Sequence, residues 1–239
     1  VQDYAAEPSE GKKELERYFL GDSLSIVKQL PSDSFDLVFT DPPYGIDVGS
    51  MNMFGAFQGD IEYDDTPEKV TELIEAILPE LHRVMKPNAF IFFWTTYSMI
   101  EQVRKWFEKV GFTVATQPFI WCKMQGAHYA PNQEQMFAYA CEFGVYAWKG
   151  KPVLSIKGEP NYILHPTVAS ADKLHPHEKP VELQKELLKR FTIATASVLD
   201  PFAGSASVHR AALEAGMKPT SIEKSETVYN KVVLKAREG

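Results

Sequence analysis

The residues best suited to chemistry are Asp41-Pro42-Pro43-Tyr44, which follow the apolar run 35–40. The run predicts a buried strand, and the two prolines end it because neither can donate a hydrogen bond to a neighbouring strand. Here the Asp41 carboxylate and the backbone carbonyls can only accept hydrogen bonds, and the Tyr44 ring comes next in the chain. Such a site suits a planar group with N–H donors, such as the exocyclic amine of a nucleobase stacked on Tyr44.

Asp41 and the Pro42 carbonyl could each accept one hydrogen of that amine. The nitrogen lone pair would then leave the conjugation of the ring, and the nitrogen would become a nucleophile. The plainer alternative is a strand followed by a Pro-Pro turn, and these four residues alone do not separate the two interpretations.

A second motif, Asp200-Pro201-Phe202-Ala203-Gly204-Ser205, joins a predicted strand to a predicted helix, and Glu223 lies 19 residues beyond Gly204. A tight turn of small residues with an acidic residue about 20 positions later is typical of a nucleotide-binding βαβ unit. The dinucleotide fingerprint has three glycines, whereas this turn has one. A ligand with an adenosine but no phosphates, such as S-adenosylmethionine, therefore fits better than a pyrophosphate.

These motifs resemble those of DNA methyltransferases that methylate amines. Asp41 to Tyr44 resembles their catalytic motif, and the segment 175–180 resembles their His-Pro-x-x-Lys-Pro element. The segment 202–206 resembles their Phe-x-Gly-x-Gly turn, with Ala206 in place of the last glycine. With Gly21-Asp22 ahead of all three, the order is that of the circularly permuted β group.

The resemblance implies a doubly wound α/β domain with a mostly parallel seven-stranded sheet, in which the strand near Val145 is antiparallel. It also implies methyl transfer from S-adenosylmethionine to the N6 amine of a flipped-out adenine in DNA. Asp41, Pro42, Pro43 and Tyr44 would be catalytic. The residues implied to bind the cofactor are Asp22, Asp41, His175, Lys179, Asp200, Phe202, Ala203, Gly204 and Glu223.

Several alternatives stay open at this stage. RNA adenine and cytosine N4 are other possible substrates, and Ala206 with the acidic surface favours a non-catalytic nucleic-acid-binding or scaffolding relative. Asp22 alone is typical of a helix N-cap. The segment 45–59, with four glycines among apolar residues, is either a lid over the ligand or a loop packed on the domain. His175 and His177 lack clear third and fourth metal ligands, so we expect no metal.

Composition and charge narrow the class of protein. With 239 residues, 44% hydrophobic and 24% charged, the chain is typical of one globular domain. The net charge is −7, and the block 60–80 alone accounts for it with eight carboxylates against Lys69. We see no signal peptide or membrane-spanning run, so we expect a cytoplasmic, nucleoid-associated protein without a membrane partner. Cys122 and Cys141 have no zinc spacing and form no disulfide framework.

We expect a flexible segment 1–16, a catalytic half 17–148, a short target-recognition excursion 149–174 and a cofactor-binding half 175–239. An enzyme that flips a base must hold the nucleic acid on both sides of it, and the acidic block is unsuited to phosphates. Two surfaces are left for DNA, one able to read base edges and one able to hold phosphates. Their residues are Gln125, His128, Asn132 and Gln133, and Lys149, Lys151 and Lys157. A homodimer is also possible, because many relatives of the β group form dimers.

Overall fold

The computed structural model describes residues 16–43, 66–124, 132, 134–168 and 178–238. Its strands are β1 (Tyr18–Leu20), β2 (Phe35–Thr40), β3 (Met85–Thr95), β4 (Thr113–Val114), β5 (Phe119–Lys123), β6 (Cys141–Lys149), β7 (Tyr162–His165), β8 (Ser197–Asp200) and β9 (Lys218–Glu223). Its helices are α1 (Ser23–Val27), α2 (Pro67–Val84), the 3-10 helix η2 (Tyr97–Met99), α3 (Ile100–Val110), α4 (Val181–Phe191), α5 (Ser207–Glu214) and α6 (Glu226–Glu238).

All these strands join one sheet in the order β1-β9-β8-β2-β3-β6-β5-β7, with β4 also paired to β6. Every antiparallel pairing involves β6, which contains Val145, so the predicted direction of that strand is confirmed. The remaining pairings are parallel. The sheet has nine strands rather than the expected seven, because the short β4 and β7 extend it. β7 lies inside the segment 149–174, which therefore returns to the sheet.

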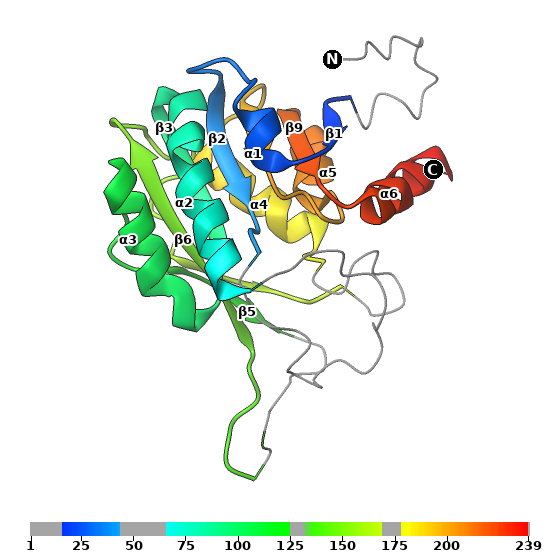
Figure 1. Ribbon diagram of the computed structural model, residues 1–239. Helices are drawn as coiled ribbons and strands as arrows, with labels where there is room; N and C mark the ends of the chain where they lie inside the picture. The colour runs from blue at the N-terminus through cyan, green and yellow to red at the C-terminus, as the bar shows by residue number, and fades with distance from the viewer. Residues whose placement is uncertain (1–15, 44–65, 125–131, 133, 169–177, 239) are drawn as a thin grey trace.

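Helices cover both faces of this sheet, as in a doubly wound fold (Figure 1). On β3, Ile91 and Phe93 belong to the core shared with α1, α2 and α3, whereas Phe90 and Phe92 belong to the core shared with α4 and α5. This alternation follows from the two-residue period of a strand with both faces buried. Among the described residues, no helix combines the length and the apolar character needed to cross a bilayer.

Local signals define the ends of the helix that follows the acidic block. Thr66 caps α2 by accepting a hydrogen bond from the Lys69 N–H at 3.4 Å, and Pro67 occupies the first helical position. The helix runs through Pro79 and ends where Met85 turns to extended backbone and β3 begins. Six buried apolar residues of α2 pack on the sheet, so burial of this face holds the helix in place.

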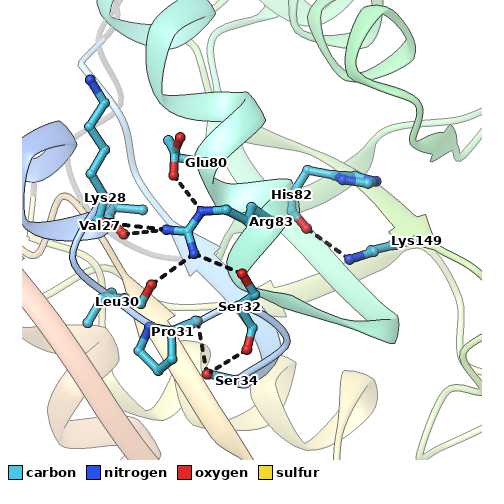
Figure 2. Close-up of polar contacts among 10 residues, drawn as sticks. All are labelled: Val27, Lys28, Leu30, Pro31, Ser32, Ser34, Glu80, His82, Arg83 and Lys149. Carbon is cyan, nitrogen blue, oxygen red and sulfur yellow. Dashed lines mark hydrogen bonds and ion pairs between the residues drawn. The ribbon is translucent and has the colours of Figure 1, made fainter.

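Arg83, in the last turn of α2, fastens the end of α1 to the rest of the domain (Figure 2). Its guanidinium donates hydrogen bonds to the backbone carbonyls of Val27 at 3.0 Å, Lys28 at 3.4 Å and Leu30 at 2.9 Å. A cation at a helix C-terminus satisfies carbonyls that have no partner within the helix. Arg83 therefore stabilises a five-residue helix that is too short to be stable alone.

Candidate active site

Four acidic residues follow four neighbouring strands at one edge of the sheet. Asp41 follows β2, Asp200 ends β8, Glu223 ends β9, and Asp22 comes two residues after β1. Because these strands are adjacent and parallel, their carboxyl ends share one edge (Figure 1). The predicted convergence of these residues on one edge is confirmed.

Asp41 is paired with Lys179, which directly precedes the N-cap of α4. The Lys179 ammonium donates to Asp41 Oδ2 and lies 3.5 Å from Glu142 Oε2. It also lies 5.1 Å from the centre of the Trp94 ring. The Lys179 side chain is only 5% exposed, and burial alone lowers its pKa. The two carboxylates more than offset this and raise the pKa of Lys179, so the ammonium stays protonated.

Glu142, on β6, is a site residue that sequence reasoning missed. Its Oε1 is 2.7 Å from the Lys123 ammonium, and its Oε2 faces Lys179. Burial raises the pKa of Glu142, but Lys179 and Lys123 together bring it below the ordinary value, so the carboxylate is ionised. The available signal was a single acidic residue inside an otherwise apolar strand.

Asp200 is fully enclosed and differs in charge behaviour from Asp41. Thr40 donates its hydroxyl to Asp200 Oδ1 at 2.6 Å, and the Phe202 N–H donates to the same oxygen at 3.2 Å. Burial raises the pKa of Asp200 to about 7, and the neighbouring charges of Asp41 and Glu223 add to that effect. The two hydrogen bonds favour the ionised form but do not offset the burial.

The turn after β8 is held by the end of β9. Glu223 accepts hydrogen bonds from the Gly204 N–H at 2.8 Å and from the Ser225 N–H at 2.7 Å. The Ala203 N–H donates to the Ile222 carbonyl at 2.9 Å. A Cβ placed on Gly204 would meet no atom within 4 Å, so space is open over the turn at this residue.

Ala206 shows why the resembling motif has a glycine at this position. Its φ is 59° and its ψ is 27°, which is the left-handed region that glycine enters without steric cost. Alanine pays ~1 kcal/mol or more for this conformation. The turn nevertheless keeps the shape that a glycine would allow, and the Ala206 side chain is buried.

Asp22 is the N-cap of α1, as its alternative interpretation predicted. Its Oδ1 accepts from the Ser25 N–H at 2.9 Å and from the Ser25 hydroxyl at 2.8 Å. Its Oδ2 lies 4.0 Å from the Lys224 ammonium. Burial acts to raise the pKa of Asp22, but the Ser25 hydrogen bonds and Lys224 lower it overall. Because capping uses only Oδ1, the cap and a ligand contact are compatible.

Several predicted residues lie outside the described part of the chain: Tyr44, Gln125, His128, Gln133 and His175. Of the group expected to read bases, only Asn132 is described. It is exposed, and its side-chain oxygen accepts from the Glu134 N–H at 3.1 Å. The segment around it leaves the sheet after Lys123 and returns at Cys141, next to Glu142, so it departs from the site edge.

The three lysines expected to hold phosphates do not lie at this edge. The Lys149 ammonium donates to Asp33 Oδ1 at 3.2 Å and to the carbonyls of His82 and Met85 at 3.1 and 2.9 Å (Figure 2). Lys149 pairs with Ala89 on β3, whereas Thr40 pairs with Phe93. Four residues of strand, ~13 Å, separate these two levels.

Lys151 and Lys157 are exposed but also lie away from Asp41. The Lys151 N–H donates to Asn88 at 2.8 Å, and the chain just before Lys157 is bonded to Arg190 in the last turn of α4. Since α4 begins beside Lys179 and is 11 residues long, ~16 Å separates its two ends. A phosphate-binding role for the three lysines near a flipped base is therefore contradicted.

Comparison with known proteins adds a family to this geometry. A family model described as DNA methylase, for N6 and N4 methyltransferases, matches residues 35–164 and 155–234. YubD of Escherichia coli (strain K12) is 29% identical over 216 residues, which cover 90% of this chain and 87% of YubD. The DNA adenine methyltransferase YhdJ of the same strain is 25% identical over 252 residues, 91% of this chain and 81% of YhdJ.

Solved structures support the same fold. The crystal structure of the M1.HpyAVI-SAM complex has a TM-score of 0.71 at 22% identity and covers 93% of this chain and 99% of its own. The cytosine-N4-specific PvuII DNA methyltransferase also has a TM-score of 0.71, at 18% identity, over 90% of this chain and 84% of its own. The predicted Rossmann-like methyltransferase fold is thus confirmed.

Proposed function

This chain belongs to the N6 and N4 methyltransferase family of DNA methylases, and we propose that it methylates the N6 amine of a flipped-out adenine in DNA. The methyl donor is S-adenosylmethionine, which supplies a methyl group activated by a positively charged sulfur. The observation that carries the proposal is the position of Asp41. Its carboxylate stands at the carboxyl end of β2, beside a buried cation and one strand away from the turn after β8.

The residues of that turn fit the cofactor. Gly204 borders open space, and the Glu223 carboxylate, held by two backbone N–H groups, keeps lone pairs that can accept ribose hydroxyls. We assign Asp22 to the adenine amine through the carboxylate oxygen that does not cap α1. Asp200, Phe202 and Ala203 complete the cofactor set. Lys179 and His175 were expected at the methionine end, and the contact of Lys179 with Asp41 assigns this lysine to the catalytic carboxylate as well.

Asp41 performs the central step by accepting a hydrogen bond from the adenine amine, while the Pro42 carbonyl accepts the other. This orients the amine and frees its lone pair. Lys179 does not act as the base, because its raised pKa keeps it protonated. The amine proton is lost after transfer. Tyr44 stacks on the extruded base, an interaction worth about 1–3 kcal/mol.

Adenine is favoured by the aspartate that begins the catalytic motif and by the similarity to YhdJ, a DNA adenine methyltransferase. Cytosine N4 is the second candidate, because the cytosine-N4-specific PvuII enzyme has the same TM-score as M1.HpyAVI. We place the DNA on the segment 124–140, which leaves the sheet beside Glu142 and carries the exposed Phe137 and Tyr139. The homodimer and RNA as a substrate stay predictions.

The test is methylation of duplex DNA with methyl-labelled cofactor, followed by chromatographic identification of the methylated nucleoside. We expect N6-methyladenine from the parent and no product from Asp41→Asn, with cofactor affinity kept within a few-fold. Asp41→Asn preserves the shape beside Lys179 better than alanine. N4-methylcytosine as the sole product would overturn the choice of base, and normal turnover by Asp41→Asn would overturn the role of Asp41.

A further inference from the structure

Four charged side chains from four elements form one continuous chain at the site. Asp41 contacts Lys179, Lys179 lies 3.5 Å from Glu142, and Glu142 lies 2.7 Å from Lys123. The signs alternate, so the group as a whole is neutral. Because only Asp41 stands in the catalytic motif, the other three charges need an explanation.

Lys179 has two neighbours besides Asp41 that limit where its ammonium can lie. The Trp94 ring lies 5.1 Å from it, and the Trp94 indole N–H donates to Gln184 of α4 at 3.2 Å, which ties the ring to the helix that begins beside Lys179. Glu142 is the second neighbour, and Lys123 holds its other oxygen. The tight contact of Glu142 is thus with Lys123, which leaves its second oxygen directed at Lys179.

An ammonium with one carboxylate partner would pair fully with that partner. Lys179 would then occupy the acceptor positions of Asp41 that the proposed reaction needs for the base amine. A second carboxylate on the opposite side draws the ammonium toward itself and weakens its hold on Asp41. We infer that Glu142 is a positioning residue that acts on Asp41 through Lys179, with Lys123 as its anchor. This inference rests on the proposed role of Asp41 and adds a residue outside the catalytic motif.

The charges that face Asp41 are Lys179, Asp200 and, beyond Lys179, Glu142. Removing the Glu142 charge leaves the Lys179 ammonium entirely to Asp41 and also removes a negative charge nearby. Both effects favour ionised Asp41, so the acid limb of the pH–rate profile moves to lower pH. Removing the Lys179 charge has the opposite effect and moves the acid limb to higher pH.

The experiment compares Glu142→Gln, Lys179→Met and the double variant with the parent. We expect Glu142→Gln to lower kcat ~10-fold, to leave cofactor affinity by calorimetry within about twofold, and to move the acid limb downward. In the Lys179→Met background the same change should cause no further loss, since it acts through Lys179. The matched control is Glu214→Gln, which removes a 2.7 Å contact with Lys185 away from Asp41 and should leave kcat unchanged.

Parental kcat in Glu142→Gln, an unmoved acid limb, or losses that multiply in the double variant would each overturn the inference, because a purely structural ion pair predicts these results. If Glu142→Gln does not fold, Glu142→Asp carries the test. It keeps the charge but shortens the reach, so kcat should fall while the acid limb and the melting temperature stay parental, and a parental kcat would overturn the inference. Activity in Asp41→Asn would instead refute the proposed function itself.

Discussion

Asp200 titrates near neutrality, so pH is a direct perturbation of the cofactor site. Its pKa is raised to about 7, chiefly by burial and further by the charges of Asp41 and Glu223. S-adenosylmethionine carries positive charge on its sulfur and its ammonium, and a cation near Asp200 favours the ionised carboxylate. Cofactor binding should therefore release a proton from Asp200 around neutral pH.

The magnitude follows from the pKa. One pH unit below it, about one molecule in ten has Asp200 ionised. If the cofactor binds only to the ionised form, its apparent Kd rises about tenfold per unit below pH 7 and levels off above it. Calorimetry from about pH 6 to pH 8, in two buffers of different ionisation enthalpy, measures both the affinity and the proton released.

Asp200→Asn should remove this pH dependence and weaken binding at high pH. Asp33→Asn is the matched control, because Asp33 is an exposed aspartate at the opposite edge and asparagine tolerates its φ of 52°. It should behave as the parent does. Equal parental affinities at about pH 6 and pH 8, with no proton release, would refute the coupling of Asp200 to the cofactor.

The same pKa has a sign for stability. The folded pKa of about 7 lies above the unfolded value of ~3.9, so the folded protein binds more protons between these values. The free energy of unfolding of the cofactor-free protein should therefore fall as pH rises through this window, by at most about 4 kcal/mol. Denaturant titrations of the parent and Asp200→Asn check this, since only the parent should show the decrease.

Three further predictions concern other parts of the fold. Arg83→Ala removes hydrogen bonds to three carbonyls at the end of α1 and should lower the free energy of unfolding by ~1–3 kcal/mol; an unchanged denaturation midpoint would contradict this. Replacing Lys151 and Lys157 with alanine should leave DNA affinity and its salt dependence unchanged, because neither lies at the site edge; a flatter salt slope would return them to the interface. Cys122 and Cys141 are register partners with sulfurs 3.7 Å apart, so oxidised glutathione should crosslink them by thiol exchange; two free thiols by mass spectrometry after treatment would contradict this.

The local sequence was sufficient to predict the strand ends that carry the site. Each of Asp41, Asp200 and Glu223 follows an apolar run that stops at a proline, a tight turn or a polar residue, and such signals act over a few residues. The helix after the acidic block was also predictable, because Thr66 and Pro67 mark its start. Since alternating strands and helices build a parallel sheet, the common edge of these acids followed from their order alone.

The tertiary structure alone decided which distant side chains meet. Glu142 lies at the site because β6 runs antiparallel beside β3 and starts at the site edge, and nothing near Glu142 in the chain encodes that pairing. The same antiparallel direction carries Lys149 to the far edge, although its charge suggested a phosphate contact. Cys122 and Cys141 become neighbours only through the register of β5 on β6. Register between strands is set by packing across the whole sheet, so residue types and spacing do not predict it.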